Sequence, residues 1–292
     1  MDRIRNAVTR ARETRETVTQ DAAAATKRLQ QAQALASASA AKTVTATTGP
    51  ATAGPATTGN DDPLNLPSVQ CNFENFARNR IIANEQDPVL NAYRVLRTRV
   101  LQKMDAEGWK TIAVVSPGSG AGKTVTAINL AIAISSKAGS RATLVDLDFY
   151  RPSVARYLGV TDAPSSLDFF EGKCTVRDVA VRPGLSDVVL IANERVTRRG
   201  AEHLTSSRAD ELINTAVHDF GSRVVIFDMS PLLGCDDTIA FLPKIDCALL
   251  VAASGDTRAD DLKEAKRILG KTNILGTVLN KAPAAFMPNQ YY

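Results

Sequence analysis

The feature that most constrains this chain is a glycine-rich stretch, SPGSGAGKTV at residues 116–125, between an apolar run, TIAVV, and a segment with helical spacing, TAINLAIAI. This order places backbone N–H groups and the positive end of a helix dipole at the loop, where they favour phosphate. Lys123 is expected to reach the β and γ phosphates, and the Thr124 hydroxyl suits Mg²⁺. The residues predicted to contact a nucleotide are Gly118, Ser119, Gly120, Ala121, Gly122, Lys123, Thr124 and Val125.

The loop departs from its usual form at one position. A glycine is expected five places before the glycine of Gly-Lys-Thr, and Pro117 occupies that place. Proline removes one N–H donor, but the three glycines that let the backbone turn and approach oxygen atoms remain. We therefore expect the loop still to bind phosphate.

Apolar runs alternate with helical stretches along the rest of the chain. The runs are TIAVVS, ATLVDLD, DVVLIAN, RVVIFDM, CALLVAA and ILGTVLN, and helices are expected at residues 124–136, 207–218 and 258–269. Another helix is expected to begin near Asp87 and Pro88 and to end at Gly108. Because the runs are apolar on both faces, we predict an α/β fold of the P-loop NTPase type, with three α/β/α layers and a mostly parallel central sheet.

The N-terminal region has a different composition. Residues 36–63 are mostly Ala, Thr, Gly and Pro, and such a segment cannot offset its ordering entropy. Good helix formers precede it, and they indicate either a solvated helix or a docking helix. We predict an N-terminal helix and linker over residues 1–70, a globular domain over 71–285 and a tail over 286–292.

Charge and composition exclude several classes of partner. The net charge of +4 comes from 35 basic and 31 acidic residues, which is too near balance to indicate nucleic acid. The four cysteines are far apart, so neither a zinc site nor a disulfide framework is expected. No run approaches the length of a membrane span. We expect a cytoplasmic chain whose membrane connection comes through a partner.

Two acids, Asp146 and Asp148, close the buried run TLVDLD. A carboxylate buried without partners is costly, so we expect at least one of the two to leave the sheet and face the phosphates. Mg²⁺ ligation and proton abstraction are the favoured roles, and capping of the strand end is the alternative. Arg151 is close enough in sequence to contact phosphate or to pair with an acid.

Two further strand ends carry polar side chains. Asp228 closes RVVIFDM, the arrangement by which proteins with a Gly-Lys-Thr loop hold Mg²⁺. Asp236 and Asp237 follow it and are interpreted as surface or helix-capping acids. Asn280 ends GTVLN, where an amide can read an adenine edge or form a turn, and both roles stay open.

With these motifs in this order, residues 86–281 resemble the bacterial tyrosine kinases of capsule and exopolysaccharide synthesis (BY-kinases). The helix AYRVLRTRV is similar to the opening helix of that family, whose acidic-Arg-Arg pattern joins subunits into a ring. Arg94 and Arg97 match that pattern, and Asn91 stands where an acid is expected. LVDLDFYRPSVARYLGV resembles the modified second Walker motif, and IFDMSPLLGCDDT the Walker B stretch, with Ser230 in place of a proline.

The resemblance implies ATP and Mg²⁺ as cofactors and transfer of the γ-phosphoryl group to tyrosines near the C-terminus, mainly of a neighbouring subunit. The residues that it implies are Lys123, Asp146 and Asp148 for catalysis, Thr124, Asp146 and Asp228 for the metal, and Tyr291 and Tyr292 as acceptors. It also implies a homo-oligomeric ring and a separate membrane partner, a polysaccharide co-polymerase that regulates chain length and recruits the chain to the inner face of the plasma membrane.

Two other functions compete with this interpretation. Partition and division-site ATPases of the ParA and MinD kind share the sheet, the loop and the acids, but they carry a lysine where this chain has Gly118. The second alternative is an ATP-binding regulator that assembles an export complex without phosphorylating it. Asn91, Ser230 and the small number of terminal tyrosines leave that function open.

Overall fold

The computed structural model describes residues 64–82 and 89–283, which lie in the unit Asn60–Tyr292. Residues 1–63 of the predicted N-terminal helix and linker, Asp87, Pro88, Tyr291 and Tyr292 lie outside the described residues. Within the described residues, seven strands form one sheet in the order β3-β4-β2-β5-β1-β6-β7. The strands are β1 Thr111–Val115, β2 Ala142–Asp146, β3 Ala180–Val181, β4 Val188–Ile191, β5 Val224–Asp228, β6 Cys247–Ala253 and β7 Asn273–Asn280.

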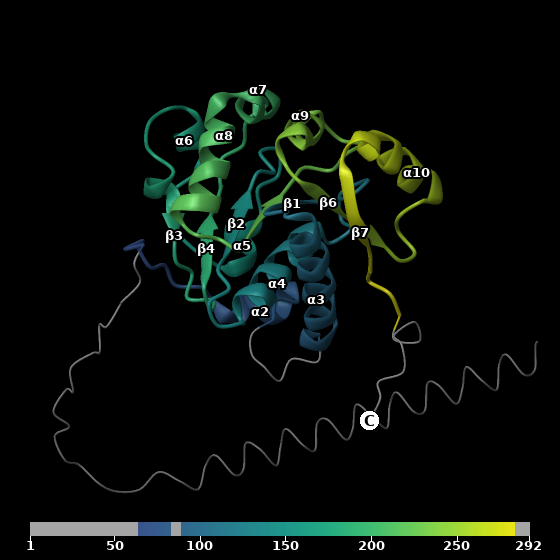
Figure 1. Cartoon of the computed structure of the whole chain (residues 1–292), viewed down its shortest axis with the longest axis horizontal. Coiled ribbons are helices and arrows are strands. Elements are labelled where there is room, and N and C mark those ends of the chain that lie inside the picture. The colour runs from purple at the N-terminus through teal and green to yellow at the C-terminus, as the bar shows by residue number, and fades with distance from the viewer. Residues whose placement is uncertain (1–63, 83–88, 284–292) are drawn as a thin grey trace, which may run out of the picture. The chain divides into compact units, whose positions relative to one another are not determined.

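All neighbouring strands are parallel except β3 and β4, which are antiparallel. Helices cover both faces of the sheet (Figure 1). One face carries α2 Phe73–Asn79, α3 Leu90–Glu107, α4 Lys123–Ser135 and α5 Val154–Leu158. The other carries α6 Ser166–Phe170, α7 Gly200–Thr205, α8 Ser207–Asn214, α9 Asp237–Phe241 and α10 Ala259–Ile268. The predicted three-layer α/β/α fold is therefore confirmed.

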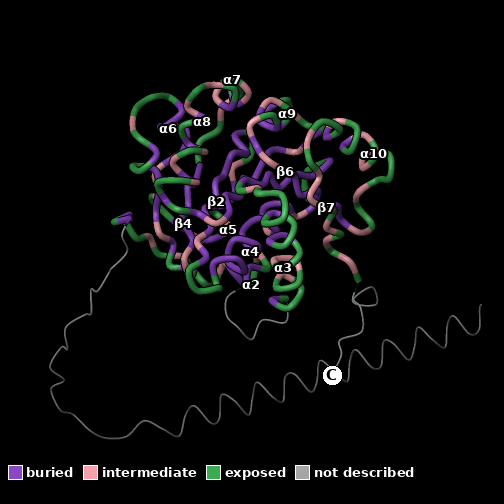
Figure 2. Tube along the Cα trace, in the orientation of Figure 1, coloured by how far each residue is buried: buried purple, intermediate pink, exposed green. Residues whose placement is uncertain are grey.

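Successive strand residues pack into opposite layers, as the two-residue period of a strand requires. In β1, Ile112 and Val114 belong to the apolar cluster under α2–α5, whereas Ala113 and Val115 belong to the cluster under α6–α10. Figure 2 shows the inner strands as buried throughout. This double burial explains why the strands are continuous apolar runs.

The segment before α3 packs against the sheet through α4. Asn129, on α4, accepts a hydrogen bond from the Ile82 N–H at 2.9 Å and donates one to the Arg80 carbonyl at 2.9 Å. Leu64 and Leu66 are also buried, although they precede the predicted start of the domain at residue 71. That boundary stays a prediction. No helix in the described part of the chain combines the length and apolar character that a membrane span requires.

We predict that Asn129→Leu lowers the free energy of unfolding by about 2–6 kcal/mol, because the Ile82 N–H and the Arg80 carbonyl lose their partner at about 1–3 kcal/mol each. Urea denaturation followed by circular dichroism measures this change. The same substitution at exposed Asn91, on α3, serves as the control and should change the free energy by less than about 0.5 kcal/mol. Equal midpoints for the two variants would contradict the anchoring role of Asn129.

Candidate nucleotide site

A cavity of about 540 Å³ opens where β1, β2 and β5 end. Its walls come from the glycine-rich loop after β1, from the chain after β2 and from the chain after β5. A position beyond the carboxyl ends of parallel strands is where ligands bind in sheets of this kind, and the volume is in the range of ligand cavities.

The loop has the backbone conformation that its glycines permit. Gly120 and Gly122 have φ angles of 82° and 90°, in the left-handed region where side chains with a Cβ are strained. Gly122 caps α4 without a side-chain hydrogen bond, so the first N–H groups of that helix remain for a ligand. Pro117 does not disrupt the loop, and its carbonyl accepts a hydrogen bond from the Leu233 N–H at 3.0 Å.

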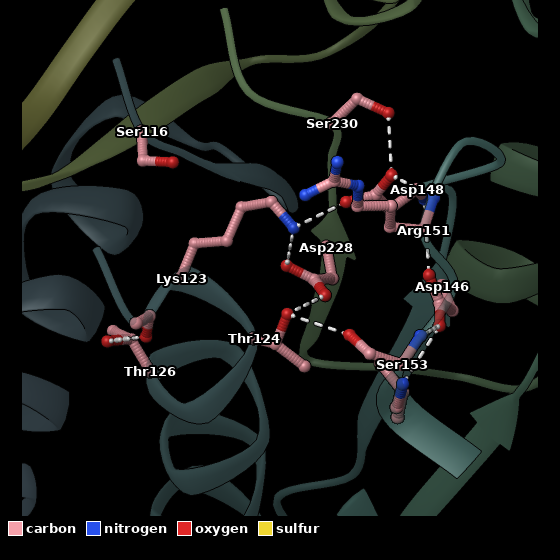
Figure 3. A network of polar contacts seen from close by, with 12 residues as sticks. Ser116, Lys123, Thr124, Thr126, Asp146, Asp148, Arg151, Ser153, Asp228 and Ser230 are labelled. Atoms are coloured by element: carbon pink, nitrogen blue, oxygen red, sulfur yellow. Dashed lines mark hydrogen bonds and ion pairs between the residues drawn. The ribbon is translucent and has the colours of Figure 1, made fainter. Parts of the chain in front are cut away.

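Lys123 is the centre of a buried ionic network (Figure 3). Its Nζ lies 2.9 Å from Asp148 Oδ2 and 3.3 Å from Asp228 Oδ1. Thr124 Oγ1 donates to Asp228 Oδ2 at 2.6 Å and lies 3.2 Å from Ser153 Oγ. The structure thus brings together four of the residues that the sequence assigned to catalysis and to the metal.

The two acids after β2 have different surroundings. Asp148 lines the cavity, and its Oδ1 accepts hydrogen bonds from Ser230 Oγ and from the Arg151 N–H, both at 2.9 Å. Asp146 is fully buried; it accepts backbone hydrogen bonds from Ser153 and Val154, both at 2.9 Å, and from Asp148 at 3.1 Å. Asp148 is therefore the acid exposed to a ligand, and Asp146 holds the loop that leads into α5.

Charge is unbalanced in this network, because one lysine faces three carboxyl groups. Burial, together with the charge of Asp228, raises the pKa of Asp146 from 3.8 to about 7. Burial also raises the pKa of Asp228, against the opposing effect of Lys123. Burial alone would lower the pKa of Lys123, but Asp228 and Asp148 outweigh it and raise that pKa. The lysine is charged at neutral pH, and the carboxyl groups share the excess negative charge.

Asn280 lies beside the loop, at the end of β7. Its Nδ2 donates to the Ala121 carbonyl at 2.9 Å, and its Oδ1 accepts from the Lys281 N–H at 2.8 Å. A Cβ at Gly122 would lie 2.0 Å from Asn280 Nδ2, so only glycine fits there. Asn280 holds the loop and also makes a turn contact. Its predicted role in reading adenine stays a prediction.

Other predicted residues lie elsewhere. Arg94 and Arg97 are on α3, outside the cavity; Arg94 is exposed, while Arg97 donates to the Ala133 carbonyl on α4 at 3.0 Å. Sequence reasoning assigned no role in the site to three other residues. Ser153 and Ser230 join the ionic network, and Arg156 lines the cavity. Single serines and arginines carry no periodic signal, so only the fold reveals them.

The residues present fit a magnesium nucleotide. The loop offers free N–H groups and a lysine, and the Thr124 hydroxyl and Asp228 carboxylate are oxygen donors beside each other. In the described part of the chain, no cluster of three or more His, Cys, Asp or Glu forms a metal site by itself. Mg²⁺ is usually bound by one or two protein groups together with substrate phosphates, and Thr124 and Asp228 supply two oxygen donors.

A wound parallel sheet, a glycine loop that opens a helix and acids at two adjacent strand ends define a P-loop nucleotide-binding protein. Residues 112–290 match the family CobQ/CobB/MinD/ParA nucleotide binding domain. The chain belongs to this family.

The chain is similar to several proteins named tyrosine-protein kinases. It is 26% identical over 204 residues to tyrosine-protein kinase YwqD of Bacillus subtilis. The aligned part covers 68% of this chain and 85% of YwqD. It is 28% identical over 207 residues to EpsB of Ralstonia solanacearum, covering 70% of this chain but only 27% of EpsB. The kinase domain of the Escherichia coli tyrosine kinase ETK has the same fold, with a TM-score of 0.65 and 22% identity over 72% of this chain and 82% of that domain.

We predict that the stability of the ligand-free chain falls as the pH rises from about 4 to about 7 through Asp146. Its pKa is raised from the ordinary value of 3.8, which holds in the unfolded chain, to about 7 in the folded chain, so the folded chain holds one more proton in this interval. A proton bound only by the folded state favours folding, and the advantage disappears above the folded pKa. Urea unfolding at several pH values measures it.

Asp146→Asn provides the comparison, since an amide does not titrate. The free energy of unfolding of the native chain minus that of the variant should increase as the pH falls from 7 to 4. Above pH 7 the difference should be constant. A difference that is flat across the whole interval would show that Asp146 titrates normally.

Proposed function

We propose that this chain is an ATP- and Mg²⁺-dependent protein-tyrosine autokinase that regulates the polymerisation and export of a capsular or exopolysaccharide. The observation that carries the proposal is the convergence of Lys123, Thr124, Asp228 and Asp148 in one cavity at the glycine loop. Similarity to YwqD and EpsB supports the tyrosine specificity. Since the chain spans about a quarter of EpsB, the activity of the whole assembly is part of the proposal.

In this proposal the loop N–H groups and Lys123 bind the phosphates, and Thr124 and Asp228 bind Mg²⁺. When bound there, the metal would neutralise charge that develops on the transferred group. Asp148 accepts the proton of the tyrosine hydroxyl while the tyrosine oxygen bonds to the γ-phosphorus and the bond to ADP breaks. Asp146, the other candidate general base, instead holds the loop that positions Asp148.

The acceptors in this proposal are Tyr291 and Tyr292, presented mainly by a neighbouring subunit. A separate membrane protein of the chain-length-regulating type recruits the chain to the inner face of the plasma membrane. Asn280 is proposed to contact the adenine from beside Gly122. These assignments are inferred from the resemblance of the sequence motifs to the bacterial tyrosine kinases. The free N–H groups of the loop support the binding of the nucleotide phosphates.

Two alternatives make different predictions. A ParA- or MinD-like ATPase hydrolyses ATP without labelling tyrosine, and Gly118 stands where such proteins carry a lysine. A non-catalytic regulator binds ATP but transfers nothing. The cavity contains Asp148 beside Lys123, a carboxylate placed to accept a proton, and this favours the kinase over the regulator.

We predict that the chain, mixed with the cytosolic segment of its membrane partner, ATP and Mg²⁺, forms phosphotyrosine at Tyr291 or Tyr292. Lys123→Met and Asp148→Asn should each lower the rate at least about 100-fold, because the first removes a charge that binds the phosphates and the second removes the proton acceptor. Mass spectrometry with labelled ATP measures the product. Lys263→Met, at an exposed lysine on α10, should retain the native rate. ATP hydrolysis without phosphotyrosine would favour the ATPase alternative.

The ring is a separate proposal and rests on α3. Arg94 is exposed, so Arg94→Ala should shift the chain to smaller species in size-exclusion chromatography while the unfolding midpoint stays the same. Arg97→Ala should also lower stability by about 1 kcal/mol, because Arg97 donates to α4. An elution profile that Arg94→Ala leaves unchanged would argue against this face of α3 as the subunit contact.

A further inference from the structure

A second cavity, of about 490 Å³, adjoins the nucleotide cavity. It is lined by Asn72 at the start of α2, by Asn75 on α2, by Thr161 after α5 and by Asn193 after β4. The two cavities share one residue, Arg156 on α5. A ligand that occupied both would therefore pass Arg156.

The order of the strands places the second cavity on one side of the phosphates. From Asn280 at the end of β7, the sheet continues through β6 to the glycine loop at β1, then to the acids at β5 and β2, and then to β4. Asn193 lies two residues beyond the end of β4, so the second cavity lies beyond the acids as seen from the loop. Phosphoryl transfer is roughly in line, so the acceptor approaches from the side opposite the leaving ADP. Asn280 is proposed above to contact the adenine on the β7 side of the sheet. The acceptor would then approach the phosphates from the opposite side, where the second cavity lies.

Arg156 has hydrogen-bonding capacity that the described residues do not use. Its guanidinium lies 5.4 Å from the ring of Tyr157, and no hydrogen bond or ion pair to it is present in residues 64–82 and 89–283. The ring contact orients the guanidinium and leaves N–H groups to donate. The side-chain amide of Asn75 likewise has no hydrogen bond in the described part of the chain.

The chemistry of the lining fits a polypeptide better than an anion. The Asn75 amide offers a donor and an acceptor, as a peptide group does, whereas the Asn193 amide already bonds Ser165 and the Arg195 backbone. The cavity lining contains one acidic residue, Glu194, and one basic residue, Arg156, so it has no net charge that favours a phosphate or an acidic lipid. A main chain with alternating carbonyl and N–H groups matches these side chains.

We propose that the second cavity binds the main chain of the tyrosine-bearing acceptor segment and that Arg156 is the positioning residue which directs it toward Asp148. The proposal rests on the kinase function proposed above. The guanidinium donates to carbonyl oxygens of the acceptor, and Asn75 binds a peptide group that precedes the tyrosines. Arg156 takes no part in the bond changes.

The test measures binding of a fluorescently labelled peptide, AFMPNQYY, to the full chain with Mg²⁺ and a non-hydrolysable ATP analogue. Arg156→Gln should weaken peptide binding at least about tenfold, the size of a lost charged hydrogen bond. Thr161→Trp, at an exposed position, should fill the second cavity and weaken binding similarly. The affinity of Thr161→Trp for the analogue should stay within about twofold of native, because Thr161 does not line the nucleotide cavity. In turnover assays, KM for the peptide should rise while kcat is retained.

Matched controls separate the possible outcomes. Arg258→Gln and Thr205→Trp change exposed residues that line neither cavity, and both should bind the peptide like the native chain. Native-like binding by Arg156→Gln and Thr161→Trp, or no binding by the native chain, would overturn the proposal. An equal loss for peptide and analogue would assign Arg156 to the nucleotide and overturn it too. Since this assay needs no transfer, failure of the kinase reaction is observed separately, as absence of phosphotyrosine.

Discussion

The site depends on one buried cation among three buried carboxyl groups. Lys123 contacts Asp148 and Asp228, and without it these acids would face one another in a dry interior. Parallel pairing of β2 and β5 sets Asp146 directly opposite Asp228, so their proximity follows from strand register. The lysine comes from the first turn of α4, which the glycine loop positions. The ionic network therefore joins three strand ends, and any shift in register would disrupt it.

Much of the fold was predictable because its strands are buried on both faces. A run such as ATLVDLD has no charged side chain until its end, and that pattern indicates an inner strand of a covered parallel sheet. The sequence did not predict β3, because a strand of two residues is too short to show a periodic pattern. It lies at the edge of the sheet and pairs antiparallel with β4. The end of α3 at Gly108 was predicted correctly, since that residue adopts the left-handed conformation.

The motif residues of the site could be found from sequence, but their partners could not. The sequence placed Asp146 and Asp148 together without deciding which one meets the ligand. That decision depends on where the chain turns: β2 stops at Asp146, whose oxygens accept backbone N–H groups, and the chain then carries Asp148 into the cavity. Ser230 donates to Asp148 across 82 residues, a contact that no local pattern predicts.

The network also explains why nucleotide and metal are expected to bind together. To contact a phosphate, Lys123 has to give up part of its interaction with Asp148 and Asp228, and the triphosphate adds negative charge to a site that already has an excess of it. Nucleotide alone would therefore increase repulsion. Mg²⁺, which Thr124 and Asp228 would hold, would supply positive charge that offsets this repulsion. Asp148 would then be free of the lysine, still oriented by Ser230, in the lining of the cavity.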